Sequence, residues 1–525
     1  MSSMGSFYLS TPIYYASGEP HIGHAYTTIL ADVLARYRRR AGDDVLFLTG
    51  TDEHGQKIQE AAAAEGVTPL ELCDVMAGRF EAAWEEMGIS HDRFIRTTEE
   101  EHIAVVRALL ERLYDNGLIY EAEYAGWYSV GQERYFTEKE IGPDRVDPIA
   151  GGPVQRIREK NYFFKMSEFR ERLVRHIEDN PEWIVPATRR NEVLGFLAQG
   201  LADLSISRPR SRIHWGIPLP WDSDQVTYVW VDALTNYVTA SGAIAPAAPS
   251  EERGFGDSRH PSWWPCDVHL MGKDILTTHA VYWPTLLMGA DLPLPRKILA
   301  HGWWVVGDTK MSKSLGNVVD PLDLREQYGT DAVRWYLMRE MPTGQDASYT
   351  PDRFLTRYDE LRNIFGNLAH RTLSMVKRYR GGTVPDAPAE SLAREAGQAM
   401  TAYRRGLDDY RFHEGFAAAM DLARAANGFV EAQEPWTLAR DPGRAGELDE
   451  TLATLVRALV VLATMFEPVM PVQARELASR LGLAGVPLLA ELEGVNLAGR
   501  STTVGQPLFP RVDPGFSDQE ETSVT

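Results

Sequence analysis

The chain has 525 residues, 44% of them hydrophobic, and a formal net charge of -20 at pH 7. This length predicts about three or four domains, and the composition is that of a globular protein. The charge argues against sequence-blind coating of nucleic acid, but an RNA could still bind to a local basic face. The sequence shows neither an apolar run long enough to cross a membrane nor a signal-peptide pattern. Its two cysteines cannot build a disulfide framework, so we expect a cytoplasmic protein.

The first part of the chain alternates predicted strands and helices. Residues 6–15 predict a buried strand, and residues 21–41 predict a helix with a periodic apolar face. The segment DVLFLTGTDEHG predicts a second strand that ends in a polar turn. Helices follow to about residue 117, with RFIRTT as a short strand among them. This order predicts a parallel sheet with helices on its faces.

An insertion interrupts this alternation. Residues 118–225 hold short aromatic strands, Gly/Pro turns and one predicted helix around residues 167–180. Strand–helix alternation returns at QVTYVWVDA, DVHLMGKDI and KILAHGWWVV. We therefore expect an α/β, Rossmann-like catalytic domain whose two halves, residues 1–117 and 226–325, are split by the insertion.

The C-terminal part is predicted to be helical. Strand signals vanish from about residue 330, and long helical patterns continue to about residue 480. We expect a linker over residues 326–350, an α-helical bundle over 351–515 and a disordered polar tail over 516–525.

Two histidines flank a glycine where the first strand gives way to the first helix. His21 and His24 are three residues apart, so on a helix both imidazoles can reach one ligand. Gly23 would let that ligand approach the backbone. The unpaired N–H groups and the positive dipole at a helix start favour a phosphate. Chance occurrence of a short motif is the alternative.

A second polar segment, DTKMSKSLGN, follows the last predicted strand of the split domain. Its two lysines, Lys310 and Lys313, alternate with hydroxyl side chains, which taken alone a solvated surface turn would also explain. The motif H-I-G-H after the first strand and K-M-S-K-S after the last together resemble the paired signatures of the class I aminoacyl-tRNA synthetases. The order and the separation of the two motifs are similar to those of that family.

Four further segments resemble the methionyl-tRNA synthetases: TPIYYASGEPHIGHAYTT, FLTGTDEHGQKI, VWVDALTNY and GKDILTTHAVYWP. With NIFGNLAHR and QEPW, the resemblance extends over residues 6–510. It implies that ATP, with Mg²⁺, activates L-methionine to methionyl-adenylate and that the methionyl group passes to tRNA(Met), including the initiator. It also makes residues 326–350 a stem-contact linker and residues 351–515 an anticodon-binding domain.

The resemblance assigns the adenylation chemistry to the two signatures and to two strand ends. In-line attack on the α-phosphorus needs positioning and charge stabilisation more than a covalent protein group. Among these residues His21, His24, Lys310 and Lys313 are expected to be catalytic. The full ATP-binding set is His21, Gly23, His24, Gly272, Asp274, His301, Gly302, Trp303, Lys310, Met311, Ser312, Lys313 and Ser314. Asp274 is equally suited to bind the ribose or to cap the next helix.

The resemblance also implies a methionine pocket with one anchor for the ammonium group. Asp52 is that anchor, with an N-cap of the following helix as its alternative role. The spacing of Ile275, His279 and Trp283 puts them on one helix face, which a plain core stripe would also explain. Leu234 departs from a proline found in part of the family. The implied pocket residues are Ile13, Tyr15, Asp52, Trp230, Ala233, Leu234, Tyr237, Ile275, His279 and Trp283.

The insertion is expected to hold no metal ion. Many members of the family bind zinc here through C-x-x-C-type pairs, and zinc prefers about four sulfur or nitrogen ligands. The matching positions in this chain are Ser129, Gln132, Asp147 and Ala150. Aromatic side chains are expected to hold the segment instead: Trp127, Tyr128, Tyr135, Phe136 and those of NYFF.

The helical part carries the expected RNA contacts. Residues 351–380 contain seven Lys/Arg against three Asp/Glu, the electrostatic pattern of an RNA-facing surface. By resemblance, the readers of the anticodon CAU are Asn367, Arg371, Pro435 and Trp436, although a core position is the alternative for Trp436. The chain stops soon after the bundle, without the further C-terminal module through which some relatives dimerise, so we expect a monomer.

Three other functions compete with this interpretation. A small-molecule nucleotidyltransferase shares the H-x-G-H helix start but would not need the helical C-terminal third. A leucine, isoleucine or valine synthetase would carry a much larger editing insertion. A non-catalytic tRNA-binding paralogue would have lost a histidine or lysine of the signatures, and all four are present. ATP–pyrophosphate exchange with each amino acid would discriminate among them.

Overall fold

The computed structural model describes residues 5–129, 134–136, 141, 145–147, 152–244, 263–306, 309–310 and 319–512. The chain divides into two compact units. The first unit comprises Met1–Pro20, Asp43–Glu85 and Ile89–His301. The second comprises His21–Gly42, Glu86–Gly88 and Gly302–Thr525. No helix within the described ranges is long and apolar enough to cross a membrane.

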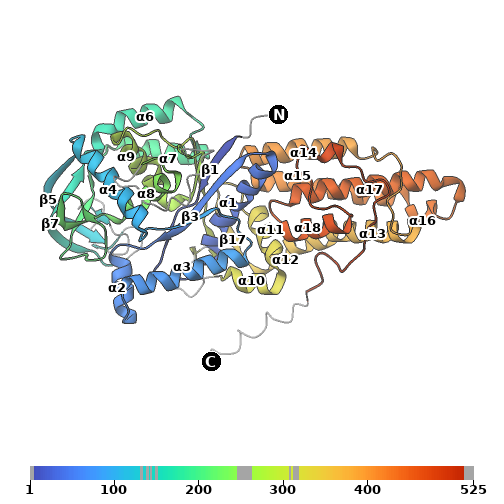
Figure 1. The fold of residues 1–525 in the computed structure, drawn as a ribbon, viewed down its shortest axis with the longest axis horizontal. Coiled ribbons are helices and arrows are strands. Elements are labelled where there is room, and N and C mark those ends of the chain that lie inside the picture. Colours follow the sequence, from blue (N-terminus) through green and yellow to red (C-terminus); the bar gives the residue numbers. More distant parts are fainter. Residues whose placement is uncertain are drawn as a thin grey trace. The chain divides into compact units, whose positions relative to one another are not determined.

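A parallel sheet forms the centre of the first unit (Figure 1). Among the described residues its seven strands are β1 (Ser6–Ser10), β2 (Tyr14–Tyr15), β3 (Asp44–Asp52), β4 (Arg93–Arg96), β8 (Ile184–Val185), β13 (Val268–Gly272) and β14 (Ile298–His301). Strand β1 pairs with β3 on one side and with β13 on the other, and every pairing in the sheet is parallel. Ligands of open α/β sheets bind at such a switch point, outside the carboxyl ends of the strands. The predicted parallel sheet is thereby confirmed.

The predicted first strand is interrupted. Strand β1 ends at Ser10, and after Pro12 the chain resumes pairing with β3 as β2. Proline cannot donate a ladder hydrogen bond, which explains the break in an otherwise buried run. The break matters because it turns residues 12 and 13 out of the ladder, after the N–H of Thr11 has donated to the oxygen of Leu48.

Helices pack on this sheet through periodic apolar faces. In the first unit they are α2 (Gln56–Glu65), α3 (Pro69–Glu86), α4 (Glu100–Asp115), α6 (Arg170–Asp179), α7 (Ala187–Ala198), α8 (Val229–Ser241) and α9 (Trp283–Gly289). Leu109 of α4, Val238 of α8 and Leu286 of α9 share one buried cluster with Tyr8 and Leu48 of the sheet. Apolar residues recurring every three or four positions give these three helices the face that this core requires.

The insertion is built from two antiparallel sheets. One contains β5 (Ile119–Ser129), β6 (Arg134–Phe136), β7 (Gln155–Phe164) and β9 (Leu204–Ser205). The other contains β10 (Ser207–Pro209), β11 (Pro218–Leu219) and β12 (Asp222–Thr227). The Rossmann-like sheet and its antiparallel insertion therefore agree with the predicted fold class.

The structure corrects two expectations about this region. A second helix, α7, follows the predicted one, and between them β8 returns to the main sheet and pairs with β14. The helix was missed because only Val193 and Leu197 of it are buried, which leaves little apolar period in the sequence. The segment QVTYVWVDA is not a strand of the main sheet, because β12 ends at Thr227 and α8 begins at Val229. Aromatic and β-branched residues favour strands, but packing overrode that preference here.

The second unit is mostly helical. Its short strands are β15 (Trp304–Val306), β16 (Thr309–Lys310) and β17 (Ala347–Tyr349). Its helices are α1 (Ile22–Ala41), α10 (Pro321–Tyr328), α11 (Thr330–Glu340), α12 (Pro351–Glu360), α13 (Asn367–Arg380), α14 (Ala393–Asp408), α15 (Phe412–Gln433), α16 (Pro435–Leu438), α17 (Ala445–Phe466) and α18 (Pro471–Arg480). The long helices α13, α14, α15 and α17, orange in Figure 1, run alongside one another. From Thr451 to Phe466 helix α17 is buried almost all round, as expected of a helix at the centre of a bundle.

A buried ion pair binds α1 to the rest of the second unit. Arg334 of α11 is fully buried and contacts Asp32 of α1 at 2.6 Å. The same guanidinium donates to the backbone oxygens of Met87, Pro468 and Val469. A buried charge is tolerated only when it is paired and hydrogen-bonded in this way. The helix that begins at the H-I-G-H motif is thus fixed to α11 and to the bundle.

Candidate active site

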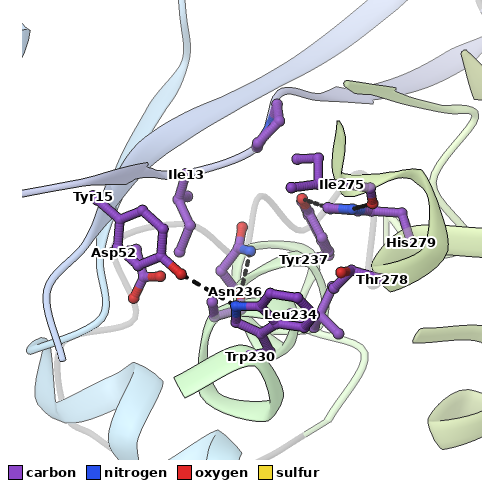
Figure 2. Close-up of a pocket in the computed structure, with 12 residues that line it drawn as sticks. Ile13, Tyr15, Asp52, Trp230, Leu234, Asn236, Tyr237, Ile275, Thr278 and His279 are labelled. Carbon is purple, nitrogen blue, oxygen red and sulfur yellow. Dashed lines mark hydrogen bonds between the residues drawn. The ribbon is translucent and has the colours of Figure 1, made fainter. Parts of the chain in front are cut away.

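A pocket lies at the carboxyl ends of β1 and β3 in the first unit (Figure 2). The link between β1 and β2 forms one wall, α8 forms another, and the short turns after β13 complete it. Its lining residues are Pro12, Ile13, Tyr15, Asp52, Trp230, Ala233, Leu234, Asn236, Tyr237, Ile275, Thr278 and His279. The structure therefore brings together every residue predicted for the methionine pocket except Trp283.

Trp283 lies behind this pocket. Its indole is fully buried and donates to Nε2 of His269 at 3.2 Å, and its ring centre is 6.0 Å from that of Tyr237. Ile275, His279 and Trp283 would share one face only in a regular α-helix. The chain instead forms a 3-10 turn, η2 (Lys273–Ile275), and a π turn, η3 (Thr278–Tyr282), before α9 begins. A 3-10 or π segment has a different number of residues per helical turn from an α-helix, so these three side chains do not stay on one face.

Three lining residues were not predicted. Pro12, Asn236 and Thr278 each precede a residue that was predicted, and they complete the wall beside it. Asn236 is fully buried, and its amide donates to the backbone oxygen of Ala233 at 2.5 Å. In a helix that begins at Val229, the spacing of Asn236 from Ala233 and Tyr237 places it near the pocket. The sequence, however, predicts a strand at the start of that helix.

A hydrogen-bond relay fixes the polar side of the pocket (Figure 2). Nδ1 of His279 donates to the backbone oxygen of Ile275 at 3.0 Å, so Nε2 accepts from the Tyr237 hydroxyl at 2.7 Å. Burial lowers the pKa of His279 to about 4, which keeps the imidazole neutral at physiological pH. Across the pocket, the indole N–H of Trp230 donates to the hydroxyl of Tyr15 at 3.1 Å. The aromatic rings are thereby held in defined orientations.

Asp52 provides the carboxylate of the pocket. It is the last residue of β3 and is only 4% exposed. Helix α2 begins at Gln56 with Gly55 at its N-cap, so the alternative role of Asp52 as a helix cap is wrong. A carboxylate among aromatic and aliphatic walls suits a ligand that carries an ammonium group next to an apolar side chain.

Three predicted ATP-binding residues of the first unit lie together at the ends of β13 and β14. Gly272 and His301 are partners in the strand register. A Cβ atom at position 272 would lie 2.6 Å from Oδ1 of Asp274 and 3.5 Å from Cε1 of His301. Gly272 therefore leaves space for the carboxylate of Asp274. That residue lies inside turn η2, whose N-cap is Gly272, so the cap alternative for Asp274 is wrong as well.

The H-I-G-H motif begins α1 in the second unit. His21 is the N-cap, and its Nδ1 accepts the backbone N–H of Gly23 at 3.1 Å. The rings of His21 and His24 stack with centroids 3.7 Å apart and planes 20° apart. A Cβ atom at position 23 would lie 2.9 Å from Cε1 of His21, so the motif needs its glycine for the cap itself. In the neutral ring this cap leaves the hydrogen on Nε2, which makes His21 a donor toward a ligand.

Within the second unit, the start of α1 is hydrogen-bonded to the chain that follows the second signature. The backbone N–H of Ile22 donates at 3.2 Å to the oxygen of Val319, which follows the K-M-S-K-S segment. Lys310 lies on β16, paired with Val305 of β15. Met311, Ser312, Lys313, Ser314 and the side chain of Lys310 lie outside the described residues.

Glycine is required just before β15. A Cβ atom at Gly302 would lie 2.0 Å from the backbone oxygen of Gln345. The next backbone N–H, that of Trp303, donates to Oδ1 of Asp346 at 2.8 Å. These contacts fix the backbone of Gly302 and Trp303, two of the predicted ATP-binding residues.

Three of the predicted RNA-contacting residues, Arg371, Pro435 and Trp436, lie near the end of α15. Arg371, one turn after Asn367 on α13, contacts Glu431 of α15 at 2.6 Å. Helix α15 ends at Gln433, and after Glu434 the short helix α16 starts at Pro435. Trp436 on α16 is 36% exposed, so its alternative role as a core tryptophan is wrong.

Aromatic packing holds the insertion, as predicted. Trp127 and Phe136 share a small core, and the rings of Tyr128 and Tyr135 lie 5.2 Å apart. The guanidinium of Arg208 lies 4.5 Å from the centre of the Tyr135 ring, a favourable cation–π distance.

A hydrogen bond joins two of the four positions at which relatives carry zinc ligands. The hydroxyl of Ser129 donates to Oδ2 of Asp147 at 2.5 Å. The other two positions, Gln132 and Ala150, lie outside the described residues. Within the part of the chain that the structure describes, no three His, Cys, Asp or Glu side chains gather as a metal site would require.

Comparison with known proteins identifies the family. The family described as tRNA synthetases class I (M) matches residues 7–146 and 146–373. The chain belongs to this family. It is 40% identical to methionine–tRNA ligase of Halalkalibacterium halodurans over 97% of this chain and 78% of that protein. It is also 40% identical to the enzyme of Thermotoga maritima over 97% of this chain and 80% of that protein.

Solved structures agree with this membership. Mycobacterium tuberculosis methionyl-tRNA synthetase in complex with methionyl-adenylate matches with a TM-score of 0.91 and 40% identity, over 97% of this chain and 100% of that one. The apo form of the same enzyme matches with a TM-score of 0.85. The predicted family, fold class and enzyme class are therefore confirmed, and the competing functions are excluded.

Proposed function

We propose that this chain is a ligase that joins L-methionine to tRNA(Met) in two steps. Methionine and ATP first give methionyl-adenylate and pyrophosphate, and the methionyl group then passes to the terminal ribose of the tRNA. The pocket at the ends of β1 and β3 is the observation that carries this proposal, because its aromatic walls and single carboxylate fit methionine. We expect ATP–pyrophosphate exchange with methionine and with no other standard amino acid at a comparable rate. A protein that is folded yet gives no exchange with methionine would refute the proposal.

Each side of the pocket contacts a different part of methionine. Asp52 accepts hydrogen bonds from the ammonium group. Ile13, Leu234 and Tyr237 surround the side chain, where a polarisable thioether packs well against aromatic rings. The neutral relay through His279 presents no charge to the sulfur atom. Selectivity against amino acids of different length comes from this fit alone, since one methylene group gives only about 10–200-fold discrimination.

The change Asp52→Asn is expected to raise the methionine KM in pyrophosphate exchange by about 10–100-fold. It replaces a charge-assisted hydrogen bond to the ammonium group, worth about 1.5–3 kcal/mol, by a neutral one. The ATP KM is expected to stay within about twofold. The matched control is Glu65→Gln, which removes one negative charge at the exposed end of α2. An equal loss for methionine and ATP would contradict the assignment.

ATP contacts both signatures and the strand ends. His21 and His24 donate to phosphate oxygens as charge develops on them, and Lys310 and Lys313 bind the departing pyrophosphate. ATP enters as its Mg²⁺ complex, so the ion is part of the substrate. The adenosine moiety contacts the predicted strand-end residues Gly272, Asp274, His301, Gly302 and Trp303.

The insertion is expected to be free of zinc. None of the four positions at which relatives hold zinc is a cysteine or histidine in this chain, and zinc favours those ligands. Elemental analysis of protein purified without added metal is expected to give far less than one zinc ion per chain. The melting temperature is expected to be the same with and without a chelator. Stoichiometric zinc, or a fall in melting temperature on chelation, would contradict this prediction.

The finer assignments belong to the same proposal. Asn367, Arg371, Pro435 and Trp436 read the anticodon of both the elongator and the initiator tRNA. The enzyme acts in the cytoplasm as a monomer, and sedimentation equilibrium is expected to give a mass near 58.8 kDa. A concentration-independent mass of twice that value would refute the monomer.

A further inference from the structure

Asp232 is a buried carboxylate held between two histidines. Its Oδ2 contacts Nδ1 of His54 at 2.7 Å, and its Oδ1 contacts Nε2 of His102 at 2.8 Å. Asp232 is 1% exposed, and His102, on α4, is fully buried. Three segments far apart in the chain therefore meet at one carboxylate: the turn after β3, helix α4 and helix α8.

This carboxylate is ionised and is hydrogen-bonded to two imidazoles. Burial works to raise the pKa of Asp232, but the charges and hydrogen bonds of the two imidazoles hold it below its usual value. Thr239 already donates its hydroxyl hydrogen to the oxygen of Thr235 at 3.0 Å. Its contact with Nδ1 of His102, at 3.2 Å, therefore needs a hydrogen on the ring. The ring of His102 is therefore held through one nitrogen by Thr239 and through the other by Asp232.

The turn that follows Asp52 is also held in place by hydrogen bonds of Glu53. The carboxylate of Glu53 is fully buried and accepts two hydrogen bonds from Arg96, at 2.7 and 3.1 Å. Its backbone N–H donates to Thr97 at 3.0 Å, and its backbone oxygen accepts from the indole of Trp215 at 2.6 Å. Glu53 thus ties the turn to β4 and to the insertion.

His54 connects the same turn to α8 through its hydrogen bond with Asp232. Asp232 precedes Ala233 and Leu234 on that helix and follows Trp230, all of which line the pocket. Asp52, two residues before His54, lines the opposite wall. Besides the bond between Trp230 and Tyr15, the bond between His54 and Asp232 therefore links the carboxylate wall of the pocket to its apolar wall.

We propose that Asp232 is a positioning residue that fixes the distance between the ammonium anchor and the side-chain cage, and so the length of the amino acid that is accepted. This inference rests on the proposed function. Asp232 lines no part of the pocket itself and acts through the turn at Asp52 and through α8. A shift of about 1 Å between two binding groups can cost up to about 10²-fold in rate, so a loss of rigidity here would appear as lost methionine affinity and lost discrimination.

The test is Asp232→Asn, which keeps the shape of the side chain but cannot accept from both imidazoles. We expect the methionine KM in pyrophosphate exchange to rise at least about tenfold and the ATP KM to stay within about twofold. The preference for methionine over ethionine, which is one methylene longer, is expected to fall at least about fivefold, because the cage no longer has a fixed length. A residue that only stabilises the fold would not separate the two substrates in this way.

Two further variants keep the test decisive. Thr239→Val removes the acceptor of His102, together with the hydroxyl bond to Thr235, and leaves Asp232 in place. It is therefore expected to shift the methionine KM in the same direction by about threefold even if Asp232→Asn does not fold. Asp331→Asn is the matched control, since Asp331 is also a carboxylate buried on a helix, α11, but belongs to the second unit. Its methionine KM is expected to stay within about twofold of the wild type.

The outcomes separate the inference from the proposed function. Folded Asp232→Asn and Thr239→Val proteins with an unchanged methionine KM and unchanged discrimination would overturn the inference alone. An equal rise of both KM values in these variants, or the same rise in Asp331→Asn, would overturn it as well. A wild-type protein without methionine-dependent exchange would instead refute the proposed function.

Discussion

Replacing Lys313 by alanine is expected to slow methionine-dependent pyrophosphate exchange by about 10²–10³-fold. The lysine would meet charge that develops on the phosphates in the transition state, and the loss of one such preorganised donor costs about 3–4 kcal/mol. We expect a similar loss for His24→Asn. The stacked arrangement of His21 and His24 at the start of α1 directs both imidazoles to the same side, so the second histidine cannot fully replace the first. Methionine affinity is expected to change by no more than a few-fold.

Two matched variants control for the loss of the side chain itself. Lys165→Ala removes a lysine that precedes α6, and His176→Asn removes a half-buried imidazole from α6. Neither residue lines the pocket or belongs to a signature, so exchange is expected to stay within about twofold. Single-turnover adenylation provides the decisive measurement. If methionine binding collapses in Lys313→Ala while the single-turnover rate survives, the lysine binds substrate in the ground state and the assigned role is wrong.

The helix start at the first signature could be predicted from the sequence because its geometry is local. His21 caps the helix that it begins, and Gly23 is needed by a ring only two residues away. Likewise, Gly272 and Asp274 are neighbours in the chain and in space. The parallel sheet could be predicted for the same reason, because the hydrophobic periodicity that distinguishes a strand from a helix lies within each single element.

Contacts between distant segments could not be predicted in this way. His54 and Asp232 are 178 positions apart in the sequence, and His102 and Asp232 are 130 positions apart. No local sequence pattern therefore predicts that these side chains are in contact. The π turn before α9 moved Trp283 off the face that a regular helix would have given it. Tertiary packing determines where the helix periodicity changes and which distant side chains form contacts. A single sequence gives no direct information about that packing.

The change Trp436→Ala is expected to raise the KM for tRNA(Met) in aminoacylation by about 10–100-fold. Stacking of one unstacked base on an aromatic ring is worth about 1–3 kcal/mol. Trp436 is suited to that role because its indole is 36% exposed on a short helix whose first residue, Pro435, is buried. The left-handed backbone of Glu434, with φ of 43°, ends α15 and sets the direction in which α16 leaves it. Arg371, held by Glu431 one turn before that point, supplies a guanidinium beside the same helix end.

The same substitution is expected to leave methionine-dependent pyrophosphate exchange within about twofold of the wild type, because the pocket residues belong to the first unit and Trp436 to the second. Leu488→Ala is the matched control, since Leu488 is also a large apolar residue of the second unit and is 39% exposed. Its tRNA KM is expected to be unchanged, because an exposed aliphatic side chain offers no flat face for stacking. Removal of a half-exposed indole is expected to cost little stability, so both variants should melt close to the wild type. A Trp436→Ala protein that melts far below the wild type, or that loses both assays equally, would show that the indole supports the bundle and does not read the RNA.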